Sequence, residues 1–209
     1  MNYRIAVTNQ KGGTGKTTST LNIGAGLARK GYKVLLIDLD PQGSLTISAG
    51  IDTTELEFTV YELLKGECKA EQAIQTAKAG DYFIIPADIN LAPAELEFAG
   101  ITGREQLLRE ALDDIATDYD FIFIDCSPSL GVLTLNALAF ADELFIPLQA
   151  EPLALAGMTS LLDTVKIINK RVNPELAVSG IIITMYDKRQ GINNYITDKQ
   201  ELYFFLFWY

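Results

Sequence analysis

The sequence predicts an α/β fold in which helices cover both faces of a mostly parallel, twisted β-sheet. Short apolar runs alternate along the chain with longer stretches of helical pattern, as they do in α/β domains. Within each short run the apolar residues are nearly continuous rather than alternating with polar ones. That pattern is typical of strands buried on both faces of a parallel sheet.

Six short runs are the expected strands, and four longer stretches are the expected helices. The strands are expected at residues 5–7, 34–37, 82–85, 121–124, 144–146 and 179–183, and the helices at residues 16–30, 103–116, 130–141 and 156–170. Gly31 directly follows the first of these helices, where a glycine commonly ends a helix.

Composition limits the classes of function. Of the 209 residues, 48% are hydrophobic and 21% are charged, which is typical of a globular domain with a sizeable core. The net charge of −10 opposes binding of polyanions by the protein as a whole, although a local basic patch can still bind DNA. No apolar run reaches the roughly 18 residues that a membrane span requires, so we expect no membrane association.

Histidine is absent from the sequence, and the cysteines, Cys68 and Cys126, lie far apart. The absence of histidine excludes histidine-based nucleophilic triads and Cys/His zinc sites. Two distant cysteines do not form a disulfide framework, so we expect a reduced, cytoplasmic protein. Cys126 is expected to act as a small packing residue.

The strongest motif directly follows the first expected strand and opens the first expected helix. Glycines there let backbone N–H groups point at phosphate oxygens, and the helix N-terminus adds partial positive charge. Lys16 would neutralise the β- and γ-phosphates, and the Thr17 hydroxyl would ligate Mg²⁺. The sequence therefore predicts a phosphate-binding loop made of Lys11, Gly12, Gly13, Thr14, Gly15, Lys16, Thr17 and Thr18.

This loop departs from the usual P-loop pattern, because Gln10 replaces the first glycine and an additional lysine, Lys11, follows it. In these features it resembles the deviant Walker A box of the ParA/MinD superfamily, whose members have a P-loop NTPase-like fold. The resemblance implies that Lys11 reaches across an ATP-dependent homodimer to the nucleotide of the partner. It also implies catalytic roles for Lys11 and Lys16.

A pair of aspartates, Asp38 and Asp40, follows the second expected strand, and Pro41, Gln42 and Gly43 come next. The carboxyl ends of strands carry the ligand sites of open α/β sheets, so these residues are expected beside the phosphate loop. Taken alone, the aspartates are also compatible with a helix cap or a solvated turn. The box at residues 40–43 resembles the first switch of ParA-type proteins, which implies that Asp40 orients the attacking water and organises Mg²⁺.

The fourth expected strand ends at Asp125, and this arrangement is typical of a Walker B motif. Asp125 is therefore expected to hold Mg²⁺, through water. The stretch at residues 125–131 resembles the second switch of the family. The metal-binding residues expected from the sequence are thus Thr17, Asp40 and Asp125.

Glu151 begins a segment that resembles the part of the family facing the dimer partner. Either it contacts the ribose of the partner's nucleotide, or it is an ordinary acid at a helix start. The guanine-recognition box Asn-Lys-x-Asp is absent, since the stretch at residues 169–172 lacks the aspartate. ATP is therefore favoured over GTP.

The resemblance implies a slow, Mg²⁺-dependent ATPase that a ParB-like centromere-binding partner stimulates. Such a protein dimerises on ATP and drives chromosome or plasmid partitioning through non-specific DNA association, so it is also nucleoid-associated. The basic residues that are candidates for DNA contact could equally form a solvated, dipole-matched helix end. They are Lys166, Lys170, Arg171, Lys188 and Arg189.

The resemblance covers residues 1–189, the expected ATPase domain, whereas residues 190–209 form an atypical tail of the same domain. The aromatic run at residues 204–209 has the polarity of neither a helix nor a strand. Two explanations stand: a native short variant whose tail packs over the sheet or a partner, or a truncated or frameshifted end. The second allows an alternative function, a weakly active or inactive nucleotide-binding module that acts through partner contacts.

Overall fold

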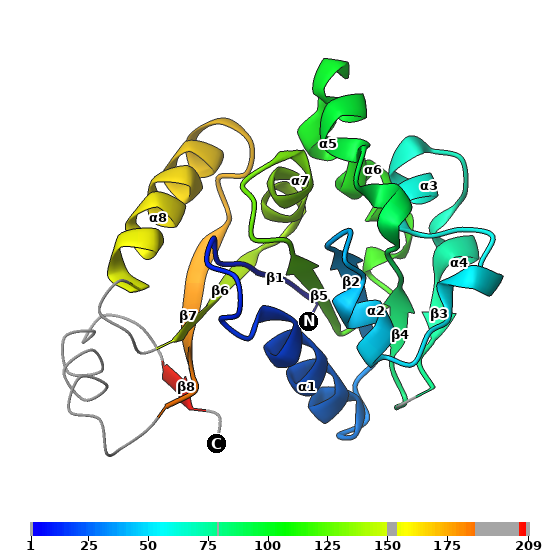
Figure 1. Ribbon diagram of the computed structural model, residues 1–209, viewed down its shortest axis with the longest axis horizontal. Helices are drawn as coiled ribbons and strands as arrows, with labels where there is room; N and C mark the ends of the chain where they lie inside the picture. The colour runs from blue at the N-terminus through cyan, green and yellow to red at the C-terminus, as the bar shows by residue number, and fades with distance from the viewer. Residues whose placement is uncertain (1, 79, 150–153, 187–204, 208–209) are drawn as a thin grey trace.

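A parallel sheet between two helical layers organises the chain (Figure 1). The computed structural model describes residues 2–78, 80–149, 154–186 and 205–207. Within these residues an eight-stranded sheet has the order β3-β4-β2-β5-β1-β6-β7-β8. Every pair of neighbouring strands is parallel except β3 and β4. The α/β fold class expected from the sequence is confirmed.

All six expected strands are present, and two further strands extend the sheet at its edges. The strands are β1 (Tyr3–Val7), β2 (Val34–Leu39), β3 (Gln75–Thr76), β4 (Phe83–Ile85), β5 (Phe121–Cys126), β6 (Glu143–Gln149), β7 (Ala177–Thr184) and β8 (Phe205–Phe207). Part of the aromatic run, whose side chains lack the polarity pattern of a strand, forms β8, which pairs in parallel with β7. Backbone pairing at a sheet edge requires only an extended chain, so it occurs without alternating side-chain polarity.

The four expected helices are also present, and several short ones lie between them. The α-helices are α1 (Lys16–Ala28), α2 (Ser44–Ser48), α3 (Val60–Lys65), α4 (Ala70–Ala73), α5 (Ala94–Glu97), α6 (Leu107–Ala116), α7 (Val132–Phe140) and α8 (Ala154–Arg171); 3₁₀ turns are η1 (Thr53–Glu55), η2 (Ile89–Leu91), η3 (Phe98–Gly100) and η4 (Arg104–Gln106). The short helices escape sequence reasoning because they are too short to display an apolar period. No described helix is long and apolar enough to cross a membrane.

The two faces of the sheet have separate cores. Helices α1 and α2 pack on one face, where Val34 and Leu36 of β2 are buried. Helices α3 to α8 cover the other face, where Leu35 and Ile37 of the same strand are buried. Every residue of β2 is buried, as the continuous apolar run predicts.

The strand order brings three chain segments together at one edge of the sheet. Strand β5 lies between β1 and β2, and its Asp125 is level with Val7 on one side and Asp38 on the other. The loops that follow these strands therefore leave the sheet side by side, at the carboxyl edge where α/β folds bind ligands.

Helix α1 approaches β2 closely at a glycine. A β-carbon at Gly24 would lie 2.6 Å from the Cδ2 atom of Leu36, a fully buried residue, whereas one at Gly26 would meet no atom within 4 Å. Gly24 thus sets the distance between the helix that carries the phosphate loop and the sheet, and Gly26 faces open space.

These two glycines provide a matched test of the packing. We expect Gly24→Ala to lower the free energy of unfolding by about 1 kcal/mol, because overpacking outweighs the gain in helix propensity. We expect Gly26→Ala to raise it by about 0.5–1 kcal/mol, because only the propensity changes. Urea denaturation of both variants measures the difference, and equal effects would contradict the close packing at Gly24.

Candidate functional site

The loop between β1 and α1 has the backbone that a phosphate-binding loop needs. Gly13 and Gly15 have φ angles of 74° and 83°, in the left-handed region that favours glycine. The loop is tied to β7, because the Thr184 hydroxyl donates a hydrogen bond to the Thr14 carbonyl oxygen at 2.8 Å. A β-carbon at Gly15 would lie 3.2 Å from Thr184 Cγ2, so glycine also permits this contact.

Helix α1 begins at this loop without a capping side chain. Its N-cap is Gly15, and no described side chain accepts a hydrogen bond from the first turn. The first N–H groups of a helix have no partner within the helix, and its dipole places partial positive charge there. The start of α1 therefore offers donors and positive potential to an anion, as the sequence predicts.

Lys16, the first residue of α1, adds a positive charge beneath the loop. It is buried, and its Nζ donates to the Lys11 carbonyl oxygen at 3.3 Å. Burial lowers the pKa of Lys16, while the charges of Asp125 and Asp40 oppose this shift. A partly desolvated ammonium group gains more from pairing with phosphate than an exposed one does. The Lys11 backbone N–H donates to Asn9 Oδ1 at 3.0 Å, and the Lys11 residue is exposed.

Asp125, at the end of β5, faces the first turn of α1. The Thr17 hydroxyl donates to its Oδ2 atom at 2.6 Å. Its Oδ1 atom is buried and accepts no hydrogen bond from the described residues. Burial raises the pKa of Asp125 to about 8, and the neighbouring Asp38 adds to the rise. A buried carboxylate with one unpartnered oxygen is a group that a cation would stabilise.

The side chains at this position fit a magnesium ion. Mg²⁺ prefers oxygen ligands, and in nucleotide sites it combines one or two protein groups with waters and phosphate oxygens. The Thr17 hydroxyl and the Asp125 carboxylate are such groups. No cluster of three or more acidic or cysteine ligands occurs among the described residues. An ion here would therefore draw further ligands from water and nucleotide.

Asp40, expected beside the phosphate loop, shares a pocket with it. The pocket has a volume of about 530 Å³ and is lined by the loop together with Asp40, Pro128 and Met185. Asp40 also holds its own turn: its Oδ1 accepts from the Gln42 N–H at 3.0 Å, and its carbonyl oxygen accepts from the Gly43 N–H at 2.8 Å. From the sequence alone, Asp40 could either stabilise a turn or lie beside the phosphate loop. In the structure it does both.

Asp38 is a residue whose structural role sequence reasoning did not identify. It is fully buried, and its Oδ2 accepts from the backbone N–H and the hydroxyl of Thr46 at 2.9 and 2.8 Å. Its Oδ1 accepts from the Asp40 N–H at 3.1 Å. Burial raises the pKa of Asp38 to about 6, against these hydrogen bonds. Asp38 thereby anchors the turn that holds Asp40. The sequence signal for this role is a charged residue within an otherwise apolar, buried strand.

The remaining candidates lie elsewhere. Lys170 and Arg171 occupy the last turn of α8, whereas Ser160, in the first half of that helix, accepts a hydrogen bond from Gln10 of the loop. Lys166 pairs with Asp163 on the exposed side of the same helix. Cys126 is buried in the core, as expected, and burial raises the pKa of its thiol. Glu151, Lys188 and Arg189 lie outside the described residues.

The sequence is similar to proteins of one family. A family model described as an AAA domain matches residues 2–178. The sporulation initiation inhibitor protein Soj of Bacillus subtilis is 42% identical over 200 residues, which cover 96% of this chain and 79% of that protein. The chromosome-partitioning ATPase Soj of Treponema pallidum is 44% identical over 204 residues, covering 98% of this chain and 79% of that protein.

Solved structures agree with the fold. Cobyrinic acid a,c-diamide synthase from Mycobacterium smegmatis, with bound ATP analog and magnesium, superposes with a TM-score of 0.91 at 41% identity and covers 97% of this chain and 83% of its own. A putative plasmid partition protein from Borrelia burgdorferi bound to AMPPNP has a TM-score of 0.83 at 30% identity, with coverages of 99% and 84%.

The buried carboxylate of Asp125 leads to a prediction about stability. Its folded-state pKa, about 8, lies above the ordinary value of 3.8. Between these pH values the folded chain binds more protons than the unfolded chain, so its free energy of unfolding falls as pH rises. Without nucleotide and Mg²⁺, we expect Asp125→Asn to be more stable than the wild type by about 1–2 kcal/mol at pH 8.

The advantage of Asp125→Asn should grow from pH 4 to pH 8 and level off above. Urea denaturation across this range measures it, with Asp114→Asn, at an exposed position of α6, as the control that leaves the profile unchanged. A destabilised Asp125→Asn variant would show that burial does not disfavour the ionised carboxylate. A stability difference from the wild type that does not vary with pH would show the same.

Proposed function

Because this chain belongs to the AAA-domain family of ParA- and Soj-type ATPases, we propose that it is a Mg²⁺-dependent ATPase that dimerises on ATP and drives chromosome or plasmid partitioning. One observation carries the proposal. The uncapped start of α1, Lys16, Thr17 and Asp40 line one pocket, and Thr17 donates a hydrogen bond to the buried Asp125 beside it. Such a set of groups suits a nucleoside triphosphate and its metal.

ATP and Mg²⁺ are the proposed ligands. Related proteins of known structure hold an ATP analog with magnesium, or AMPPNP, on the same fold. In this chain the loop amides and Lys16 would bind the phosphates, with the glycine backbone at residues 12, 13 and 15 close to them. Thr17 and Asp125 would hold the metal, whose contribution is to neutralise charge that develops on the phosphates.

The carboxylate of Asp40 would orient the attacking water and accept a hydrogen bond from it. The Asp38 network supports this role, because it fixes the turn at both Asp40 and Thr46. A carboxylate held by a rigid turn loses little conformational freedom when it binds water, so it positions the nucleophile at small entropic cost. Turnover is proposed to be slow until a ParB-like partner stimulates it.

Partitioning would follow from a nucleotide-timed cycle of DNA association. The basic side chains near the end of α8 are candidates for non-specific contact with DNA. Binding of this type releases counterions from the phosphates, so it weakens steeply as salt rises. The protein would act in the cytoplasm and on the nucleoid. Glu151 is a further proposed contact, to the ribose of the partner's nucleotide.

The ATPase activity is tested by phosphate release. We expect the wild type to release phosphate from ATP with Mg²⁺, and Lys16→Ala and Asp40→Asn each to lower the rate about 100-fold. Asp40→Asn should keep its affinity for ATP, because the carboxylate acts on water rather than on phosphate. Lys30→Ala, at an exposed position after α1, is the charge-matched control.

Wild-type release no faster than that of Lys16→Ala would favour the alternative function, a nucleotide-binding module that acts through partner contacts. The assay contains no acceptor other than water. Phosphate released under these conditions therefore comes from hydrolysis of ATP. It does not come from a synthase reaction, the activity in the name of the mycobacterial structure.

The role of Lys11 is tested by assembly. Lys11 is exposed on the phosphate loop, and the proposed role in trans requires it to contact the nucleotide of a second protomer. We expect Lys11→Ala to bind ATP with unchanged affinity but to dimerise about 10-fold more weakly, since one cation–phosphate contact is lost across the interface. Light scattering with a slowly hydrolysed ATP analogue measures this, with Lys30→Ala as control. Unchanged dimerisation and turnover would rule out the role in trans.

A further inference from the structure

Helix α7 begins without a capping side chain of its own. Its N-cap residue is Gly131, and its first turn contains no acidic residue. The first N–H groups of a helix have no partner within the helix, and a serine, threonine, asparagine or aspartate at the N-cap commonly accepts from one of them. Here the acceptor comes from another element, because the Val132 N–H donates to Glu95 Oε2 of α5 at 2.7 Å.

The residue at the N-cap makes room for this distant acceptor. Gly131 has φ and ψ angles of −84° and −167°, an extended backbone that any residue adopts. A β-carbon there would overlap the Glu95 carboxylate, so the contact, rather than the backbone, requires the glycine. A serine or aspartate at position 131 would cap α7 without help from α5. The chain instead joins the start of α7 to a residue 37 positions earlier in the sequence.

The Glu95 side chain extends from a firmly packed helix. Ala94 and Phe98, which precede and follow it, are buried in the core. Helix α5 lies against α7 (Figure 1). The Glu95 Oε1 atom is buried and accepts no hydrogen bond from the described residues. Shielding a carboxylate oxygen from water without a donor is costly, so the contact is kept despite a penalty.

The start of α7 is also the end of the loop that follows Asp125. Residues 127–131 join β5 to α7, and Pro128 among them lines the pocket at the phosphate loop, the nucleotide pocket. The Thr134 hydroxyl donates to the Ser129 carbonyl oxygen at 2.7 Å, so the loop is attached to the first turn of the helix. The position of that turn therefore determines where the loop passes the nucleotide pocket.

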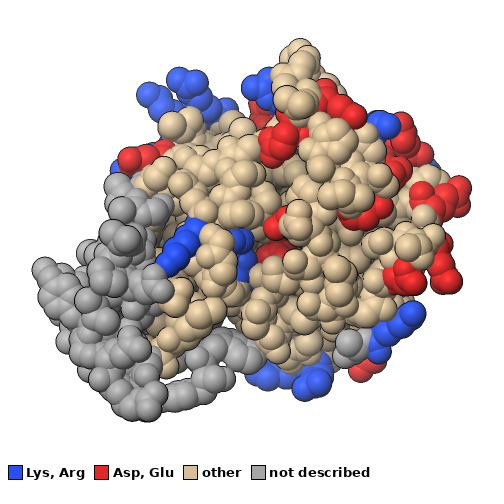
Figure 2. Space-filling model, in the orientation of Figure 1, with Lys and Arg blue, Asp and Glu red and all other residues tan. Residues whose placement is uncertain are grey.

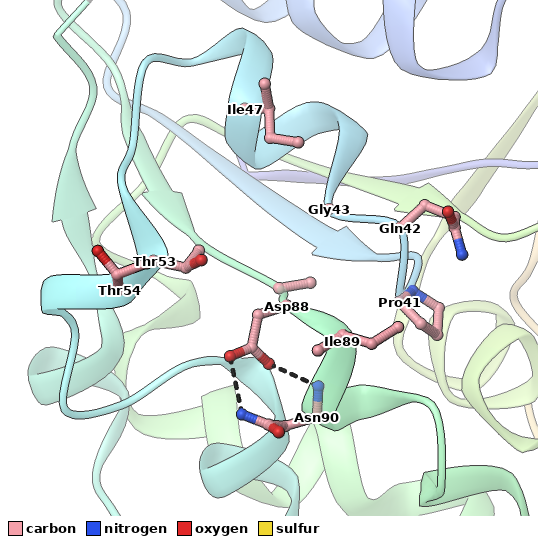
Figure 3. A pocket seen from close by; sticks show the side chains of 10 residues that line it. Pro41, Gln42, Gly43, Ile47, Thr53, Thr54, Asp88, Ile89 and Asn90 are labelled. Carbon is pink, nitrogen blue, oxygen red and sulfur yellow. Dashed lines mark hydrogen bonds between the residues drawn. The ribbon is translucent and has the colours of Figure 1, made fainter.

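The segment that leads to α5 is attached to the Asp40 turn at its other end. The Ala87 N–H donates to the Thr46 hydroxyl at 2.9 Å, and Thr46 donates to Asp38, which holds that turn. The residues that follow β4 also lie beside the turn (Figure 3). Residues 87–95 thus connect the Asp40 turn to the start of α7.

From these contacts we propose that Glu95 is a positioning residue for ATP hydrolysis. By holding the first turn of α7, it fixes the loop that follows Asp125 relative to the Asp40 turn. In the proposed function Asp125 holds the metal and Asp40 orients the attacking water, so the two carboxylates must keep a set geometry. Glu95 does not line the nucleotide pocket and acts through the backbone. The proposal rests on the proposed function and adds a residue outside that pocket.

Substitutions of Glu95 test this role through the kinetics of phosphate release. We expect Glu95→Ala to lower kcat about fivefold, because the loop after Asp125 becomes less ordered. The KM for ATP should stay within about twofold of the wild-type value, since the phosphate loop is unchanged. Glu95→Gln should keep kcat within about twofold, because its amide oxygen still accepts from the Val132 N–H. Glu95→Asp keeps the charge but is one methylene shorter, so it should behave as Glu95→Ala.

Gly131→Ala tests the same contact from the other side. Its β-carbon would displace the carboxylate, so we expect kcat to fall about fivefold here too. In the Glu95→Ala background the same substitution should cause no further loss, because the contact is already absent. Losses that multiply would show that the two residues act independently and would overturn the proposal.

Glu97→Ala is the matched control on the same helix. Figure 2 shows acidic side chains on the surface around α5, so the loss of one negative charge has to be separated from the loss of the contact. Glu97 accepts a hydrogen bond from the Tyr61 hydroxyl of α3 at 2.7 Å, and we expect Glu97→Ala to keep the wild-type kcat. An equal fall in this control, or a normal kcat in Glu95→Asp but not in Glu95→Gln, would assign the effect to charge and overturn the proposal.

Amide hydrogen exchange, followed by NMR on the full chain, measures the contact without turnover. We expect the Val132 amide to exchange about fivefold faster in Glu95→Ala than in the wild type, and Glu95→Gln to keep the protection. Urea denaturation of the same variants separates stability from kinetics. A lower free energy of unfolding in Glu95→Ala with an unchanged kcat would make Glu95 a structural cap only and overturn the positioning role.

The Lys16→Ala variant distinguishes a failure of this role from a failure of the proposed function. Wild-type release above that of Lys16→Ala, with an unchanged kcat in Glu95→Ala, overturns the role of Glu95 and leaves the ATPase intact. Wild-type release no faster than that of Lys16→Ala removes the ATPase and the positioning role together. Exchange of the Val132 amide then still decides whether Glu95 holds the start of α7.

Discussion

Two buried carboxylates on neighbouring strands form the constraint on which the rest of the site depends. Asp38 of β2 and Asp125 of β5 are level with one another, and both are almost completely shielded from water. Like charges in such surroundings raise each other's pKa and oppose folding. The chain tolerates the pair because Thr46 and Thr17 donate hydrogen bonds to them and Lys16 lies close by.

The two carboxylates are stabilised to different extents, which explains how one pair supports two tasks. Asp38 accepts three hydrogen bonds from its own side of the sheet, so its interactions are complete within the fold. Asp125 keeps one buried oxygen without a described donor and faces the start of α1. The first carboxylate therefore stabilises the turn, and the second keeps an oxygen that a cation would stabilise. Strain of this type is commonly retained at functional sites.

How much the sequence could predict depended on whether a feature is local. The long strands, the phosphate loop and Asp125 have signals within a few residues. The structure contains these strands, with the glycine-rich loop at the start of α1 and Asp125 near the end of β5. The hydrogen bonds of Asp38 to Thr46, and of Ala87 to Thr46, join segments distant along the chain, and no local period reveals them. The cavity lined by Pro41, Ile47 and Asp88 was missed for the same reason, since its walls come from separate segments (Figure 3).

A glycine in the loop that follows Asp125 shows how such distant links constrain the sequence. Gly131 has an extended backbone that any residue adopts, so its conformation does not require glycine. A β-carbon there, however, would lie 2.1 Å from the Glu95 carboxylate that caps α7. The glycine therefore makes room for α5 to hold the start of α7. Glu95 thereby links α5 to the start of α7, directly after the loop that begins at Asp125.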